Sequence, residues 1–239
     1  MALTRVQTAV SANQADPGSA TFTVGPTEGN LLVALVSNRS GQSLGVGTAT
    51  ISGSGWTQII GRDTELADAD HRRAIAAFWK VAGASEPSTI EIDNGQTDTK
   101  AVILAEYNDD AAGTWDFAEK ADNDNGVTNG ATSIGTGTTA STSGNQLIVT
   151  LFSRRNNATT PDATVTFTTA GNVFSTALGS FASQLASGFS TSSSAGTKTD
   201  TASTDSDNSG LSAAIMVFTA TAGGGGGATH PGWVGLGWW

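Results

Sequence analysis

A glycine-flanked serine is the first pattern in this chain that could support chemistry. Gly41-Gln42-Ser43-Leu44-Gly45 has the spacing of a nucleophile elbow, a sharp turn that exposes a serine above the start of a helix. Residues 46–51 follow it, and their richness in Gly, Thr and Val predicts no helix there. Such a match arises easily in a chain rich in Gly and Ser. We therefore interpret Ser43 as part of a polar loop.

The two histidines, His71 and His230, are the candidate bases for such a serine. His71 lies in a charged run and is interpreted as a surface residue, whereas His230 precedes Pro231 and is interpreted as an interfacial contact. Two isolated histidines make a catalytic zinc site improbable. The absence of cysteine excludes a disulfide, a thiol nucleophile and a zinc-thiolate site. The sequence predicts no catalytic residue, no cofactor and no enzyme activity.

Carboxylates gather in three runs, and Ca²⁺ prefers several oxygen ligands on flexible loops. None of the runs has the register of an EF-hand, because the glycine in 122–126 falls one position out of place. We interpret the runs as solvated loops, and a structural Ca²⁺ site remains the alternative. A glycosidase pair would need two carboxylates across a cleft. The runs contain Asp63, Glu65, Asp68 and Asp70, then Asp122 and Asp124, then Asp200, Asp205 and Asp207.

Three tryptophans could bind sugars if they were exposed. Trp56, Trp79 and Trp115 each lie beside a predicted strand. Large aromatic side chains dominate core burial, so we interpret all three as core residues.

Charge and composition limit the partners. The 239 residues carry a net charge of −10 with only 11 Lys and Arg, which argues against direct nucleic-acid binding. Acidity instead favours solubility or a basic partner surface. No apolar run is long enough for a membrane helix, and no Sec signal is expected at the N-terminus.

The elements that must position these residues are strands. Apolar runs alternate with Gly and Asn turns, a pattern typical of an all-β, antiparallel β-sandwich of jelly-roll-like type. Five runs are predicted to supply the core: 31–37, 76–81, 101–107, 147–152 and 213–218. A helix over 63–78 is a weaker alternative. The polar junction 109–129 carries Trp115 and Phe117, so it is expected to pack.

The order of these patterns repeats once along the chain. Gly29-Asn30 leads into an apolar run, and Gly144-Asn145-Gln146 leads into another. The sequence predicts a body over 1–222 with two weakly similar halves, 1–110 and 111–222. These could be two stacked sandwiches or one sandwich closed by both, and we favour one sandwich.

The C-terminal end differs from the body in composition. Five glycines at 223–227 predict a flexible linker, and 228–239 contains three of the six tryptophans. A peptide this short cannot bury three indoles by itself. We predict an anchor that docks on a neighbouring copy or a larger assembly, with folding back onto its own sandwich as the alternative. The predicted partner-binding residues are His230, Trp233, Leu236, Trp238 and Trp239.

The string Phe78-Trp79-Lys80-Val81-Ala82-Gly83-Ala84-Ser85-Glu86-Pro87 resembles a family of β-sandwich proteins encoded among tailed-phage structural genes and in bacterial surface proteins. The resemblance covers about 20–220. Glu106-Tyr107-Asn108-Asp109 departs from the family's Tyr-Arg-Gly ending. The resemblance implies a virion or surface location and no cofactor. Within that setting we expect a capsid decoration or cement protein that binds the major capsid protein or another virion protein, as a homo-oligomer, because the sequence shows no heptads for the trimerising stalk that an adhesin usually needs. A receptor- or glycan-binding tail adhesin is the alternative.

Overall fold

The computed structural model describes residues 2–13, 17–40, 49–64, 72–93, 99–110, 113–125, 131–155, 164–177, 183–208 and 210–221. Within these ranges the chain forms strands and no helix, which confirms the all-β prediction. No described segment is a helix long and apolar enough to cross a membrane.

Within the described residues, each half contributes eight strands. The first half contains β1 (Leu3–Asn13), β2 (Gly18–Thr21), β3 (Leu31–Ser40), β4 (Thr50–Ile51), β5 (Thr57–Thr64), β6 (Arg72–Val81), β7 (Thr89–Asp93) and β8 (Thr99–Asp109). The second contains β9 (Thr114–Asp124), β10 (Ala131–Thr138), β11 (Asn145–Arg155), β12 (Val165–Phe167), β13 (Gly171–Ala177), β14 (Ser183–Ser192), β15 (Thr199–Asn208) and β16 (Leu211–Thr221).

The strand order shows a jelly roll in each half. The first half forms a five-stranded sheet, β1-β8-β3-β6-β5, and a three-stranded sheet, β2-β7-β4. Strand β1 pairs with β8, β2 with β7 and β3 with β6, all antiparallel, so the chain behaves as one long hairpin rolled into two layers. The second half repeats the order as β9-β16-β11-β14-β13 and β10-β15-β12.

The repeat extends to the irregularities of the strands. Val6 is the extra residue of a β-bulge in β1, because Arg5 and Gln7 pair with successive residues of β8. Ala118 is the extra residue at the matching place in β9. The turns before β3 and β11 each contain a glycine with positive φ, Gly29 at 85° and Gly144 at 94°. The matching bulges and pairing registers identify equivalent residues in the two halves.

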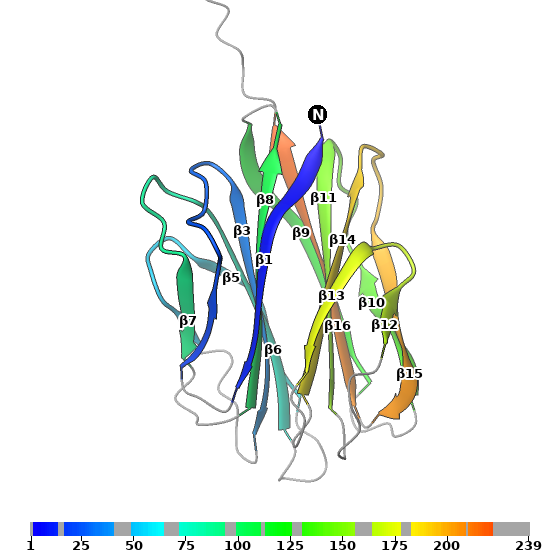
Figure 1. Cartoon of the computed structure of the whole chain (residues 1–239). Coiled ribbons are helices and arrows are strands. Elements are labelled where there is room, and N and C mark those ends of the chain that lie inside the picture. Colours follow the sequence, from blue (N-terminus) through cyan, green and yellow to red (C-terminus); the bar gives the residue numbers. More distant parts are fainter. Residues whose placement is uncertain are drawn as a thin grey trace, which may run out of the picture.

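Four layers stack side by side in Figure 1, with the two five-stranded sheets in the middle and a three-stranded sheet on each outer side. Each half therefore has its own pair of sheets. The arrangement differs from the single sandwich favoured by the sequence pattern, and corresponds to the alternative of two stacked sandwiches. The apolar runs were visible in the sequence, but which sheet each run joins depends on long-range pairing.

The main core lies between the two five-stranded sheets. Leu31, Val33 and Leu35 of β3 point into it, and Leu147, Val149 and Leu151 of β11 meet them from the other sheet. The five predicted core runs all lie in strands of these two sheets, which confirms their core role.

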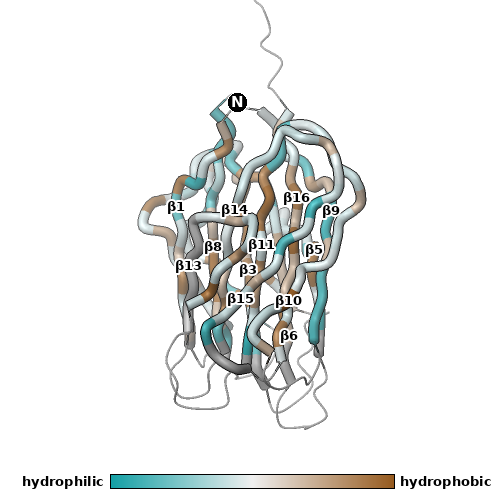
Figure 2. The backbone as a smooth tube through the Cα atoms, turned by 90° about the vertical axis from the view of Figure 1, so that its right-hand side faces the viewer, coloured by the Kyte–Doolittle hydropathy of each residue, from teal (hydrophilic) through white to brown (hydrophobic). Residues whose placement is uncertain are grey.

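Strand β3 is buried on both faces. Leu32, Ala34 and Val36 point away from the main core into a second cluster, under the outer sheet of the first half. A third cluster, with Phe152 and Ala213, lies under the outer sheet of the second half. Figure 2 shows this layering, with pale and teal outer strands β10 and β15 in front of browner strands such as β11 and β16.

Candidate functional site

Two seams join the halves, and equivalent strands form them. In the closed seam, β9 contacts β5 and β6. In the open seam, β1 contacts β13 and β14. The hydroxyls of Ser37 and Ser153, which are equivalent residues of β3 and β11, lie 2.5 Å apart in the buried interior between the halves. This contact between equivalent residues marks the approximate two-fold relation of the halves.

Aromatic side chains fill the upper part of the closed seam. The ring centroid of Trp79 lies 6.4 Å from that of Phe117 and 5.8 Å from that of Phe218. Phe117 and Phe218 are 5.8 Å apart and nearly edge-to-face. Trp115, two residues before Phe117 in β9, is only 6% exposed. Tilted and edge-to-face rings at these distances pack favourably, so this seam is sealed by ring contacts.

Ion pairs and a hydrogen bond join β5 and β9 in the same seam. The Arg62 guanidinium donates to Asp122 at 2.6 Å and also to Asp124, and Lys120 donates to the carbonyl oxygen of Ile59. Partial burial opposes the charge of Arg62, but the two carboxylates outweigh it and raise its pKa. Asp122 and Asp124 therefore join two strands, and are not the solvated loop residues that the sequence suggested. Residues this far apart in sequence give no local sign of pairing.

The open seam carries smaller or more polar residues at the equivalent positions. The strand registers match Arg5 with Phe117, Phe189 with Trp79, and Tyr107 with Phe218. Leu3 likewise takes the place of Trp115. The tight aromatic group of one seam thus becomes an arginine, a phenylalanine and a tyrosine in the other.

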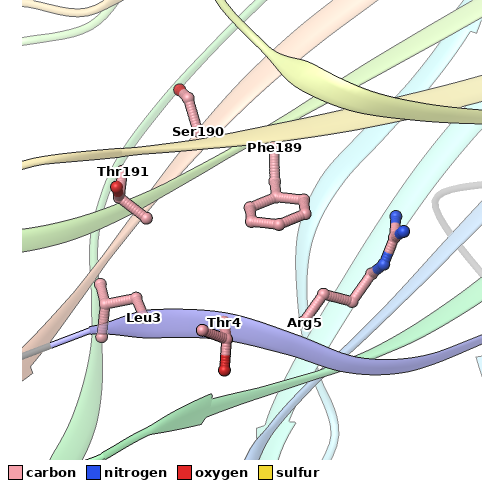
Figure 3. Close-up of a pocket in the computed structure, with 6 residues that line it drawn as sticks. All are labelled: Leu3, Thr4, Arg5, Phe189, Ser190 and Thr191. Carbon is pink, nitrogen blue, oxygen red and sulfur yellow. The ribbon is translucent and has the colours of Figure 1, made fainter.

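These replacements leave a hollow of about 440 Å³, which we call the seam hollow. In Figure 3, Leu3 and Phe189 reach into the space between β1 and β14, while Thr4 and Ser190 point away. The Arg5 guanidinium carbon lies 5.5 Å from the centre of the Phe189 ring, within cation–π range. The hollow is lined by Leu3, Thr4, Arg5, Phe189, Ser190 and Thr191.

Tyr107 contacts Phe189, which lines this hollow, edge-to-face with 5.4 Å between ring centres. Its side chain is fully buried, and its hydroxyl has no hydrogen-bond partner among the described residues. Burial raises the pKa of Tyr107 well above its usual range, and the positive charge of Arg5 offsets only part of that effect. The phenol is therefore neutral at physiological pH.

The hollow lies at the end of the stack where the described chain begins and ends, which we call the terminal end. There the Asp110 amide donates to the Ala2 carbonyl oxygen, and the Thr114 and Thr221 hydroxyls are 3.0 Å apart. A second hollow, lined by Ala2, Leu3, Asn145, Thr191, Ser192 and Ser193, adjoins the first. A third is lined by Thr27, Glu28, Gly29, Asn30, Asn108, Asp109, Asp110, Gly113 and Trp115.

A buried carboxylate fixes the turn beside the third hollow. Glu106 is fully buried and accepts hydrogen bonds from the Gln7 and Asn30 amide groups, each at 2.6 Å, and from the Thr27 amide at 2.8 Å. Its equivalent in the second half is the apolar Val217. Glu106 therefore has a structural role at this turn.

The remaining predicted residues divide into packing and backbone roles. Trp79 and Trp115 pack as predicted, and Trp56 is partly buried, with the Lys80 ammonium 5.6 Å from its ring centre. Asp200 is only 3% exposed and accepts hydrogen bonds from three backbone amides. Asp205 accepts one from the Thr164 amide. Asp200 is thus buried, in contrast to the solvated loop expected, whereas Asp205 is exposed as expected but lies in strand β15.

Several predictions fall outside the described residues. These include Ser43, His71, Glu65, Asp68 and Asp70, and the whole segment 222–239 with His230, Trp233, Leu236, Trp238 and Trp239. The side chains of Asp63 and Asp207 are not described either. Within the described ranges, no three His, Asp or Glu side chains gather as a metal site would require.

Arg5 and Phe189, which line the seam hollow, were not singled out from the sequence. Their signal would have been the difference between equivalent positions of the two halves, which becomes visible only once the registers are known. Comparisons of the chain with protein-family models, curated proteins and solved structures found no match.

Proposed function

We propose that this protein is a structural, non-enzymatic component of a phage virion that decorates or cements the shell. Its partner is the major capsid protein or another virion protein, and it forms a homo-oligomer. The resemblance of 78–87 to the tailed-phage β-sandwich family supports this proposal, and a compact four-layer body suits a protein that must pack on a lattice.

The observation that carries the proposal is the location of the chain's exit from the body. Strand β16 ends at Thr221 at the terminal end, beside three hollows. The segment that follows contains Trp233, Trp238 and Trp239 behind five glycines. Tryptophans are typical hot spots of protein interfaces, so we assign the contact with the shell to this end of the molecule.

The copy number in purified particles separates this function from the adhesin alternative. Quantitative mass spectrometry should find the protein in numbers comparable to the major shell protein, because a decoration protein follows the shell lattice. A handful of copies per particle would contradict decoration and favour a tail adhesin.

Deletion of 223–239 tests the contact. We expect the truncated body to remain folded, because its four layers lie within 1–222, and to lose association with particles. Thermal unfolding and co-sedimentation with particles measure the two properties separately. Normal particle binding by the truncated protein would overturn the assignment of the contact to the C-terminal segment.

A further inference from the structure

A comparison of the side chains at equivalent positions of the two seams indicates what kind of side chain could fill the seam hollow. At the closed seam, the equivalent space is filled by Trp79 and Phe117 packed on Phe218. At the open seam, Phe189 and Tyr107 keep their aromatic contact, but Arg5 occupies the position of Phe117. The hollow of about 440 Å³ beside Arg5 and Phe189 leaves room for one more large aromatic side chain.

The lining of the hollow suits an indole. Leu3 and Phe189 provide apolar surfaces, and the Arg5 guanidinium already lies over an aromatic ring. Arginine stacks well on the face of tryptophan. The hollow opens to solvent at the terminal end, so an indole could enter it without unfolding either sheet.

The chain itself carries a tryptophan within reach. Thr191 of the hollow and Phe218 of β16 pair with the same residue, Leu147, from opposite sides. They are thus two strand spacings apart, about 10 Å. Between Thr221 and Trp233 lie eleven residues, 222–232, which can extend to about 36 Å. A glycine-rich tether of this length gives a high effective concentration of the tryptophan near the hollow.

We propose that Trp233 of the C-terminal segment, which lies outside the described residues, docks into the seam hollow of its own chain and packs against Phe189 under Arg5. Trp233 is the tryptophan with the shortest tether, which favours it over the two that follow. Its docking holds the start of the segment on the terminal end and leaves Trp238 and Trp239 for a partner. The proposal concerns the isolated protein and does not require that it decorate a shell.

Disulfide trapping in the full-length protein tests the docking directly, because the chain has no cysteine of its own. The probe pair is Ser193→Cys, on the rim of the adjoining hollow, with Val234→Cys next to Trp233. The matched control pairs Val234→Cys with Thr166→Cys, an exposed residue of β12 in the outer sheet. Under mild oxidation we expect the probe pair to form an intramolecular disulfide at least about tenfold faster than the control pair.

Two further substitutions in the probe-pair protein identify the docked side chain. Trp233→Ala should slow trapping by about tenfold or more, as expected for removal of a buried tryptophan anchor, and Trp238→Ala should leave the rate unchanged. Thr191→Tyr, which fills the hollow, should also slow trapping, whereas Thr166→Tyr should not.

Three results would overturn the proposal. The first is trapping of the probe pair no faster than that of the control pair. The second is a disulfide-linked dimer as the main product, which would mean that a second copy supplies the segment. The third is dependence of trapping on Trp238 instead of Trp233.

Discussion

At the scale of single residues, Tyr107 is the clearest difference between the two halves. Its equivalent Phe218 has the same ring without the hydroxyl, and the Tyr107 hydroxyl is buried with no hydrogen-bond partner among the described residues. A buried polar group without a partner typically costs about 1–3 kcal/mol. The fold therefore retains a polar atom that its own repeat does without.

Tyr107→Phe should stabilise the protein by about 1 kcal/mol, because it removes that unpaired donor. It should also change the pH dependence. Burial raises the pKa of Tyr107 in the folded state. The part of the free energy of unfolding that depends on its protonation is therefore constant below the unfolded-state pKa and falls as pH rises above about 10.

Denaturant unfolding between pH 8 and 11 checks both effects. The wild-type free energy of unfolding should fall more steeply above pH 10 than that of Tyr107→Phe, by up to about 1.4 kcal/mol per pH unit. Because the chain has one tyrosine, the difference between the two proteins isolates this group. If the two free energies of unfolding changed with pH in parallel, or if the variant were less stable, the Tyr107 hydroxyl would not be a buried group without a partner.

At the scale of elements, the two seams predict unequal effects of substitution at equivalent positions. Phe117→Ala removes a ring that touches both Trp79 and Phe218, and should cost about 2–3 kcal/mol because the ring is only partly buried. Arg5→Ala, at the matching position of the open seam, should cost about 1 kcal/mol or less. Midpoints of urea unfolding measure both variants, and equal losses would show that the seams are equally packed.

The sequence predicted the strands that are buried on both faces better than the strands at the sheet edges. The run 31–37 is apolar at nearly every position because β3 packs against a cluster on each side. Strand β9 is an edge strand and carries Asp116, Glu119, Lys120, Asp122 and Asp124, so its polar sequence was interpreted as a junction that packs. The expected packing of Trp115 was correct, but the strand itself was missed. Strand β13 was missed as well, since 171–177 has no clear alternation.

The seam hollow was beyond sequence analysis for a different reason. Its walls come from the beginning of β1 and the end of β14, and nothing in the local pattern of either strand specifies that they meet. The candidate binding residues 230–239 were chosen by composition alone, and they lie outside the described residues.

At the scale of the whole molecule, the two halves share one core and should unfold together. Leu31, Val33 and Leu35 are covered by residues of the other half, so either half alone would expose this face to water. Calorimetry should therefore show a single transition, with equal calorimetric and van't Hoff enthalpies. Two separate transitions would mean that each jelly roll is stable without its neighbour.

The contact between Ser37 and Ser153 has a consequence for symmetry. Two identical jelly rolls packed about a true two-fold axis would have two identical seams. Any substitution that packed one seam more tightly would then occur in the other seam as well. Covalent linkage of the halves removes that constraint, because Arg5 and Phe117 can differ although they occupy equivalent positions. The linked chain can thus use one seam for cohesion and leave the other available for binding, a division of labour that a symmetric pair cannot have.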